Sequence, residues 1–445
     1  MNQTNNPMAT KPVLKLLMSM AIPPMISMLI QSLYNIIDSI YVSQISDNAL
    51  TAVSLVFPLQ NIVLAVAVGF GVSVSACISM NLGAKDQDAV NKTATHGVVL
   101  TFLHSLLFII AGLLVTKPFL SLFTDNQQIF TWGCQYSYIV TTLAFGQLFM
   151  ILIEKIYQAS GNMVIPMLVQ LIGCVINIVL DPILIFGKFG FPELGVVGAA
   201  IATVFAQICS FIIYLIIFTR RNYGIHIKLR GFHFEKHIVK RLYSIAFPSA
   251  IMMSLPSILI GILNGILIKI SVAAVAVLGI YFKLQTFVYM PASGVIQGMR
   301  PIISYNHGAG SKDRVLKTIK SGFLVICVIM TLGTILSLAL PNQVLKLFNA
   351  TDDLLSMGAT ALRIICLGFI LSTFSIVLSG AFEALGKGFQ SLTISLLRQL
   401  IILIPLSYIL ASSMGATGVW ISFPIAEGIA ALVSLLLMKK YILTK

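Results

Sequence analysis

The sequence predicts an all-α membrane protein in which twelve transmembrane helices form two six-helix lobes, related by a pseudo-two-fold axis along the membrane normal. Three observations support this fold class: an apolar composition, regularly spaced hydrophobic segments and an internal repeat. Of the 445 residues, 58% are hydrophobic and 9% are charged, whereas a soluble domain carries about 25% charged residues. These proportions exclude a soluble fold, a disulfide-rich secreted scaffold and a disordered chain.

Twelve apolar segments are separated by charged or Pro- and Gly-rich breaks, and each is long enough to cross a bilayer as a helix. They span residues 15–45, 50–80, 93–116, 130–153, 163–187, 194–218, 241–270, 276–305, 316–340, 355–382, 390–413 and 416–438. The one sizeable connection, residues 219–240, is rich in Lys and Arg. We therefore predict an amino-terminal lobe at residues 11–218, a basic cytoplasmic linker at 219–240 and a carboxyl-terminal lobe at 241–443.

Positive charge is distributed unevenly between the connections. Most of the 28 Lys and Arg residues lie on the same side as the amino terminus, whereas the opposite side holds Lys117, Lys188, Lys269 and Lys346. Because connections rich in Lys and Arg stay in the cytoplasm, both termini are predicted to be cytoplasmic. The net charge of +14 is then explained by topology beside anionic membrane lipids, and no nucleic-acid partner is predicted.

The two halves of the chain match each other in a constant register. Pro23, Gly83 and Gly161 are matched by Pro248, Gly308 and Gly386, each pair 225 residues apart. After the fifth segment the offset becomes 220, which aligns residues 195–207 with 415–427. Two copies that both begin and end in the cytoplasm share one topology, so we expect a cavity at their interface and alternating access by rocking of the lobes.

Motifs of metal and nucleotide chemistry are missing from the sequence. The six cysteines form no CxxC pair, so neither a zinc site nor a disulfide framework is indicated. There is no HExxH motif and no nucleotide-binding glycine loop. The sequence therefore predicts that the protein is not an enzyme, needs no cofactor and does not use ATP.

A few polar residues lie inside the apolar segments of the first half. Ionisable side chains at bilayer depth are costly and mark functional sites by default. Asp38, Asp181 and Thr203 are expected at the same depth near the outer leaflet, to within roughly 3 Å at the helical rise per residue. Asn177 precedes Asp181 by four residues and therefore shares its face.

This polar set has no counterpart in the second half. The equivalent positions are occupied by Leu263, Ile402, Leu406 and Phe423. Two carboxylates without a Lys or Arg at the same depth in their lobe cannot both stay ionised cheaply. We expect them to share a proton or to coordinate Na⁺ through carboxylate, amide and hydroxyl oxygens. The alternative is an inert polar network that caps helix ends.

Other residues are predicted to line a substrate cavity or to hold structure. The first apolar segment carries a polar stripe at helical spacing, and methionines can offer an adaptable surface to flat hydrophobic ligands. The predicted cavity residues are Gln31, Tyr34, Asn35, Glu154, Met253 and Gln285. Glu154 is expected either in a cation vestibule or at a solvated helix end with Lys155. In the second half, Arg398 and Glu427 are expected to form a structural ion pair.

Several motifs resemble the multidrug and toxic compound extrusion (MATE) family. They are NLGAKDQDAV (81–90), NHGAGSKDRV (306–315), YNIIDSIYVS around Asp38 and INIVLDPILIF around Asn177 and Asp181. The resemblance extends from Lys11 to Leu443, and QASGN after Glu154 is similar to the small bacterial multidrug exporters.

The resemblance implies a V-shaped pair of lobes in a prokaryotic plasma (inner) membrane. It implies export of organic cations in exchange for Na⁺ or H⁺, and a cation site at Asp38, Asn177, Asp181 and Thr203, with the Ala199 carbonyl as a further ligand. The chain departs from the branch of the family that carries acids on spans seven and ten of the carboxyl lobe. Here span seven has no acid and span ten has only Glu383, near its cytoplasmic end, so no ion site is predicted there.

The leading hypothesis is a secondary active antiporter that expels amphipathic, cationic drugs, acting as a monomer without an obligate protein partner. Ion binding would change the bend of the first helix at Pro23 and Pro24 and so weaken drug binding. A lipid-linked oligosaccharide flippase of the same superfamily is the alternative, but its pyrophosphate substrate favours a cationic cavity over buried acids. A major-facilitator transporter is a third possibility, and the connection after the second segment lacks the GxxxDxxGRR-like run that it requires.

Overall fold

The computed structural model describes residues 6–220, 224–346 and 352–443, and all the regular secondary structure within these ranges is helical. Within these ranges, eleven helices are long and apolar enough to cross a membrane. A twelfth span is a bent pair, α5 (Gln127–Thr142) and α6 (Phe145–Ala159), whose axes differ by 43°. The predicted all-α fold with twelve spans is confirmed, and each predicted segment overlaps one span.

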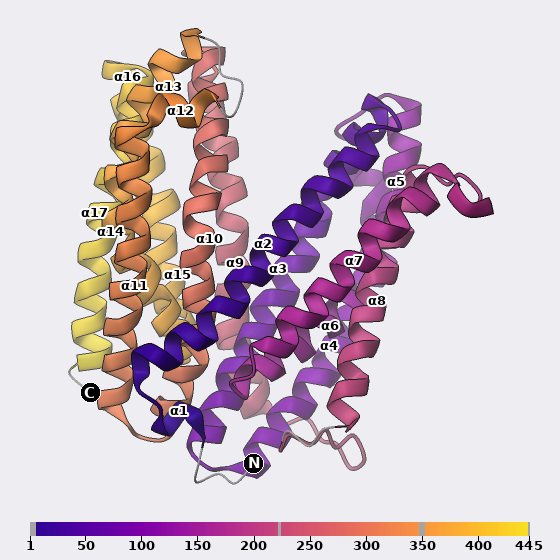
Figure 1. The fold of residues 1–445 in the computed structure, drawn as a ribbon, viewed down its shortest axis with the longest axis vertical. Coiled ribbons are helices and arrows are strands. Elements are labelled where there is room, and N and C mark those ends of the chain that lie inside the picture. The colour runs from indigo at the N-terminus through magenta and orange to yellow at the C-terminus, as the bar shows by residue number, and fades with distance from the viewer. Residues whose placement is uncertain (1–5, 221–223, 347–351, 444–445) are drawn as a thin grey trace. The chain divides into compact units, whose positions relative to one another are not determined.

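The chain divides into two compact units, and the first comprises the described parts of Met1–Thr10 and Ile26–Ala250. Most of its helices are drawn from indigo to magenta in Figure 1. Besides α5 and α6, its elements are α1 (Pro7–Thr10), most of α2 (Val13–Ser43), α3 (Asp47–Gly83), α4 (Gln87–Ser121), α7 (Val164–Phe186), the 3₁₀ turn η2 (Lys188–Gly190) and α8 (Val196–Arg220).

The second unit comprises Lys11–Met25 and the described part of Ile251–Lys445. Its elements are most of α9 (Lys236–Leu267), then α10 (Val272–Gly308), α11 (Lys312–Ala339), α12 (Pro341–Lys346), α13 (Asp352–Ile365), α14 (Leu367–Ala384), α15 (Gly388–Leu396), the π-helix η3 (Leu397–Ile401), α16 (Leu403–Met414), α17 (Ala416–Met438) and the π-helix η4 (Lys439–Leu443). The break between α13 and α14 is the repeat counterpart of the bend between α5 and α6.

Two helices, α2 and α9, are each divided between the units. The division follows Met25 in α2 and Ala250 in α9, positions that are 225 residues apart. Two glycines mark the corresponding contacts: a Cβ on Gly69 would lie 2.7 Å from the Ala250 backbone N, and a Cβ on Gly294 would lie 3.0 Å from the Met25 backbone N. The beginning of α9 therefore packs on α3, and the beginning of α2 packs on α10.

The repeat is visible in matching hydrogen bonds as well as in the sequence. The Ser79 hydroxyl donates to the Ala159 carbonyl at 2.9 Å, and the Ser304 hydroxyl donates to the Ala384 carbonyl at 2.7 Å. Helix caps at Ser46 and Ser271 correspond in the same way, because each side chain accepts from the backbone N–H three residues later. The two six-helix halves therefore share their local geometry.

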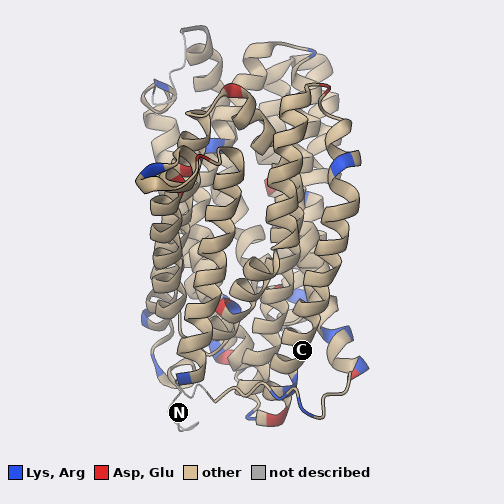
Figure 2. Cartoon of the chain, turned by 90° about the vertical axis from the view of Figure 1, so that its right-hand side faces the viewer, with Lys and Arg blue, Asp and Glu red and all other residues tan. Residues whose placement is uncertain are grey.

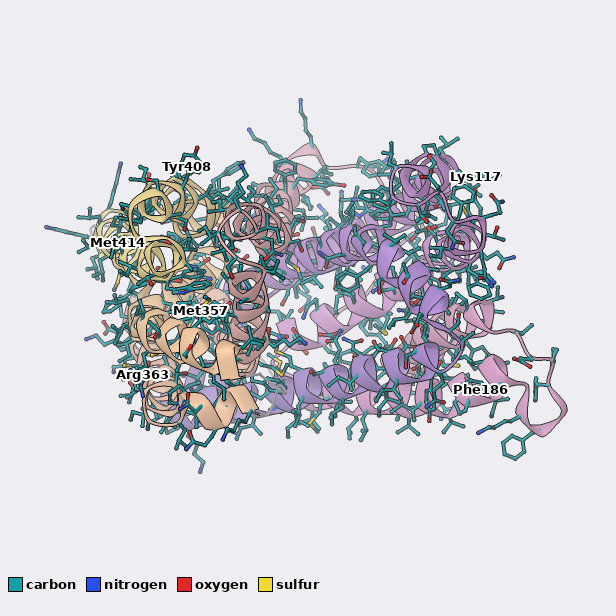
Figure 3. All side chains as sticks on the ribbon, turned by 90° about the horizontal axis from the view of Figure 1, so that it is seen from above. Lys117, Phe186, Met357, Arg363, Tyr408 and Met414 are labelled. Carbon is teal, nitrogen blue, oxygen red and sulfur yellow. The ribbon has the colours of Figure 1, made fainter. Side chains whose placement is uncertain are left out.

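The exterior of the helices is apolar. Leu114 is 69% exposed and Tyr408 is 68% exposed, and Figure 3 places the Tyr408 side chain at the periphery of the second unit. Charged residues gather mainly near helix ends, as Figure 2 shows. Large apolar side chains are unfavourable on a surface that faces water. They are expected on the outside of a helix bundle that is surrounded by lipid.

The segment before α9 docks on α4. The Asn91 side-chain oxygen accepts from the His226 N–H at 2.8 Å, and Thr95 Oγ1 accepts from the Lys228 N–H at 3.1 Å. Ile225 is buried in the core that α3, α4 and α6 form. Of the predicted linker, residues 221–223 lie outside the described ranges, and the residues that follow them belong to the first unit.

Candidate functional site: a buried carboxylate cluster

Helices α7 and α8 pack closely, and this contact brings their polar residues together. A Cβ on Gly198 would lie 2.5 Å from the Leu184 carbonyl oxygen, so a side chain there would push the helices apart. The two helices run side by side in Figure 1. Helix α7 ends at Gly187, whose φ of 67° is left-handed and suits glycine. The close approach places the face of α7 that carries Asp181 against α8.

Asn177 connects Asp181 with the backbone of α8. In the amide orientation that satisfies both of its polar atoms, Asn177 Nδ2 donates to Asp181 Oδ2 at 2.9 Å, and its oxygen accepts from the Thr203 N–H at 3.2 Å. Asn177 and Thr203 are 2% and 7% exposed, and Asp181 is 0% exposed. A fully buried carboxylate needs compensation for its lost hydration, and a single amide donor supplies only part of it.

Helix α2 adds a second carboxylate to this cluster. Asp38 lies close enough to Asp181 for their charges to interact. Asp38 Oδ1 and Thr203 Oγ1 are both buried and make no hydrogen bond within the described residues. Tyr34 on α2 and Tyr136 on α5 lie beside Asp38 and Thr203. The structure therefore brings together Asp38, Asn177, Asp181 and Thr203, as the sequence predicts.

The donor set fits a small hard cation or a proton. Two carboxylates, a hydroxyl and nearby backbone oxygens are the ligands that hard cations prefer. Most buried polar atoms in proteins have a hydrogen-bond partner, so two unpartnered oxygens beside a buried carboxylate need an explanation. A coordinated cation would use both oxygens, and a proton held by the two carboxylates would remove their repulsion.

Comparison with protein families matches the chain to MatE twice, over residues 23–183 and 248–409. These two matches start 225 residues apart and together cover most of the chain. The chain belongs to the MatE family. This confirms the family resemblance that the sequence motifs indicate. As a MATE transporter, the protein is not an enzyme.

Individual MATE relatives agree with this assignment. The multidrug export protein MepA of Staphylococcus aureus strain MSSA476 is 27% identical over 432 residues, covering 96% of this chain and 94% of that protein. MepA of Staphylococcus haemolyticus is 28% identical over 429 residues, covering 96% and 93%. Among solved structures, a MATE protein described as being in the straight conformation aligns with a TM-score of 0.91 and 26% identity, covering 98% of both chains.

A second solved relative of this MATE chain shows what the likeness leaves open. A MOP-superfamily transporter from Pyrococcus furiosus aligns with a TM-score of 0.91 and 25% identity over 98% of both chains. The description of that structure states that the reversed polarity of its binding pocket suggests a different function. A shared fold in this family therefore does not determine the substrate, and the side chains of the site must carry that argument.

The remaining predicted residues of the MATE cation site and cavity lie in different surroundings. Ala199 is 1% exposed and precedes Thr203 by one helical turn. Gln31 and Asn35 are exposed, and their side chains make no hydrogen bond within the described residues. Met253 and Gln285 belong to the second unit. Their assignment to a substrate cavity stays a prediction.

Glu154 belongs to a separate polar network on α6 of the MATE chain. Lys155 Nζ lies 2.9 Å from Glu154 Oε1, and Gln158 Nε2 donates to the same oxygen at 2.7 Å. The Lys155 side chain is 8% exposed and that of Glu154 is 19% exposed. This pair is largely buried, which differs from the alternative of a solvated helix end.

Tyr136 and Gln60 are neighbours of the cluster that sequence reasoning missed. Gln60 Nε2 donates to the Tyr136 hydroxyl at 3.3 Å, and Tyr136 is 3% exposed. Neither side chain is a carboxylate or a base, so a search for charged groups in the apolar segments does not find them. The available signal was Gln60, a polar residue inside an apolar span whose repeat counterpart is Gln285.

Proposed function

We propose that this MATE transporter is a secondary active antiporter that exports amphipathic, cationic organic compounds in exchange for H⁺ or Na⁺. The observation that carries the proposal is the pair of unpartnered oxygens, Asp38 Oδ1 and Thr203 Oγ1, next to the buried Asp181 carboxylate. The coupling ion binds at these groups together with Asn177. The multidrug export named for the MepA relatives supports a small-molecule substrate.

The charge of the cluster explains how an ion is coupled to a cationic drug. Taking a carboxylate out of water costs several kcal/mol unless a positive charge compensates it. A proton or Na⁺ at Asp38 and Asp181 supplies that charge, and α2, α7 and α8 all contribute to the site, so their packing depends on ion occupancy. Neutralising the acids also removes the attraction that the amino-terminal unit exerts on a cationic compound. Ion entry therefore favours drug release.

The proposal includes an orientation and a location. The chain lies in the plasma membrane of a prokaryote with both termini in the cytoplasm, because Lys and Arg are concentrated in the connections on that side. In this orientation the carboxylate cluster lies toward the outer leaflet, where ions from outside reach it. The chain acts as a monomer, since one polypeptide contains both halves of the repeat.

Removing either acid tests the proposal. We expect Asp38→Asn and Asp181→Asn each to reduce efflux of ethidium and norfloxacin from cells by at least about tenfold, roughly 1.4 kcal/mol. An amide keeps the size of the side chain but holds neither a proton nor a cation by charge. Efflux is measured by fluorescence of preloaded cells, and the amount of protein in the membrane by immunoblot.

The matched control is Asp125→Asn, because Asp125 is an exposed acid in the connection before α5. We expect this variant to export both compounds at the normal rate. Normal efflux by both cluster variants at normal protein levels would contradict the ion site. Loss of efflux in the Asp125 variant as well would point to a general effect of removing negative charge.

A further inference from the structure

One exposed face of α11 changes from basic to apolar along the helix. Exposed residues recur on it at spacings of three or four, so they share one side of the helix. They are Lys317, Lys320, Leu324, Val328, Leu332 and Ile335. The four apolar side chains are between 53% and 62% exposed. Because α11 qualifies as a membrane span, this face is a surface for lipid acyl chains.

The two lysines and the first apolar residues of this face belong to the same leaflet. Leu324 follows Lys320 by about one helical turn, and Val328 follows Leu324 by about one more. Half of a hydrocarbon core of about 30 Å corresponds to about ten residues of helix. A phospholipid whose chains cover Leu324 and Val328 therefore has its phosphate at the level of Lys317 and Lys320.

The positive charge of this helix end is not neutralised. Lys317 and Lys320 are exposed and take part in no ion pair or hydrogen bond with a described residue. Arg314 adds a third cation, and its Nη2 donates to the Lys11 carbonyl at 2.8 Å, which brings Lys11 to the same end of the unit. Asp313 is the one acid in the first three turns of α11. The patch therefore carries a net positive charge.

The equivalent lysine of the first half is already paired. Lys92 in α4 is the repeat counterpart of Lys317. Its Nζ lies 3.1 Å from Asp88 Oδ2 and 3.0 Å from Glu235 Oε1. In the second half Asp313 stands at the position of Asp88, but Lys317 makes no ion pair within the described ranges. The same helix end is thus neutralised by the chain itself in one half and left positive in the other.

The neighbouring position differs more strongly between the halves. Thr95, the counterpart of Lys320, is buried, and its Oγ1 accepts from the Lys228 N–H at 3.1 Å. The segment before α9 therefore covers this end of α4, whereas Lys320 is exposed. Farther along α4, exposed apolar residues continue in the same register: Leu103, Leu107 and Ile110. Both halves thus present an apolar face to lipid, and the second half adds an open, basic end to it.

We propose that Lys317 and Lys320 bind the headgroup phosphate of an anionic phospholipid whose acyl chains lie along Leu324 and Val328. The lysine stems follow the apolar face while the ammonium groups reach the phosphate. An anionic lipid is favoured over a zwitterionic one, because the choline or ethanolamine cation of the latter would meet the same lysines. In the proposed orientation this lipid belongs to the cytoplasmic leaflet. The site lies wholly in the second unit and does not depend on the coupling ion or on the exported compound.

Photo-cross-linking from the apolar face gives a local readout of the bound lipid. The full-length protein carrying Leu324→p-benzoyl-phenylalanine is reconstituted in vesicles of equal parts phosphatidylglycerol and phosphatidylcholine, and the lipid adducts are measured by mass spectrometry. With both lysines present, we expect phosphatidylglycerol adducts to exceed phosphatidylcholine adducts by at least about tenfold, since each lysine near the headgroups adds to the attraction. Soluble glycerol phosphate, which has no acyl chains, should leave this ratio unchanged.

Replacing the two lysines should remove the preference. With Lys317→Gln and Lys320→Gln together, we expect the two adducts to be equal to within about twofold. Because both side chains are exposed and unpaired among the described residues, the variant should unfold at the wild-type temperature. Lys317→Arg with Lys320→Arg keeps the charge and should keep the preference.

The matched control removes two positive charges from the segment before α9. Lys228 and Arg230 are both exposed and lie outside the helices, so Lys228→Gln with Arg230→Gln should leave the adduct ratio as it is. An equal loss in this control would show a response to net charge alone and would overturn the proposal. Equal adducts with both lysines present, or an unchanged preference in the glutamine variant, would overturn it as well. Displacement of phosphatidylglycerol by glycerol phosphate would contradict the assignment to lipid.

Discussion

Thr203 has a buried hydroxyl beside Tyr34 and Tyr136 that makes no hydrogen bond meeting geometric criteria within the described residues. A hydroxyl in this position has either a ligand or an unfavourable desolvation. The choice between these alternatives has a direct consequence for mutation. If the hydroxyl contributes to ion binding, its removal lowers the affinity for the ion and leaves the stability of the fold unchanged.

We expect Thr203→Val to raise the ion concentration needed for half-maximal drug export by about tenfold, roughly 1.4 kcal/mol. Valine has nearly the same shape, so the unfolding temperature should stay the same or rise slightly. Thr203→Ser keeps the hydroxyl and should keep ion affinity near normal. Transport in membrane vesicles at varied ion concentration provides the measurement, and equal ion dependence in both variants would exclude the hydroxyl as a ligand.

Gly71 makes room for the buried stem of Lys155. A Cβ on Gly71 would lie 2.7 Å from Lys155 Cγ. The repeat counterparts exchange the roles of large and small residue: a Cβ on Gly380 would lie 2.6 Å from Ile296 Cγ2. The same space is therefore filled by a lysine in one half and by an isoleucine from the opposite helix in the other.

Alanine at Gly71 should destabilise the protein by about 1–3 kcal/mol through overpacking. The matched control is Gly279→Ala in α10, where a Cβ would have no neighbour within 4 Å. That change should be neutral or stabilise by about 0.5–1 kcal/mol, because alanine is the better helix former. Thermal unfolding in detergent micelles measures both, and a Gly71 variant as stable as the wild type would show that Lys155 can move away.

At the scale of elements, a buried imidazole helps to fix the segment before α9 to α4. His96 is 1% exposed, and its Nδ1 lies 2.8 Å from the Lys92 carbonyl oxygen. Nδ1 must carry the proton to donate there, so Nε2 is free to accept from the Glu235 N–H at 2.9 Å. The rings of Phe232 and Phe234 pack around His96.

Removing this imidazole should loosen the segment. We expect His96→Ala to increase the rate of trypsin cleavage at Lys228 and Arg230 by about tenfold, since an unpaired buried donor costs about 1–3 kcal/mol. The control is His226→Ala, because the His226 side chain is exposed and only its backbone N–H is used. Gel electrophoresis measures the cleavage. Equal cleavage rates in the two variants would mean that the other contacts hold the segment without the imidazole.

Hydropathy predicted the spans well because membrane helices are set by length and apolarity. It placed their ends too far inward in α3 and α4, where Ser46 and Asp86 cap helices that continue beyond the apolar segment. Hydropathy also carries no information about which helix packs on which. The division of α2 after Met25 and of α9 after Ala250 depends on glycine contacts distant in sequence, so it could not be predicted.

The charged members of the cluster could be predicted from the sequence, and the uncharged aromatic member could not. Asp38 and Asp181 stand out in apolar segments because ionisable groups are expensive there, and helical spacing adds Asn177. Tyr136 gives no such signal, since tyrosine is common in membrane helices. The π-helix Leu397–Ile401 gives no such signal either, because it lies inside an uninterrupted apolar segment.

At the scale of the whole molecule, the two halves share a fold and differ in chemistry. The first half places acids where the second places Leu263 and Leu406, and the second half places Arg398 where the first has Gly173. A duplicated transporter with identical halves would bind ions and substrates equally on both sides. Under the proposed function, we therefore expect the first half alone to determine which ion gradient drives transport.

Inside-out vesicles allow this to be measured. If H⁺ is the coupling ion, an acidic lumen should drive drug uptake; if it is Na⁺, a sodium-loaded lumen at equal pH should do so. In either case the responding gradient should lose its effect in Asp181→Asn, and Leu406→Asp, which adds an acid to the equivalent position of the second half, should not restore it. The matched control is Asp125→Asn, which should respond as the wild type does. Uptake that depends on ATP and on neither gradient would contradict antiport, because the carboxylate cluster would then have no ion to exchange.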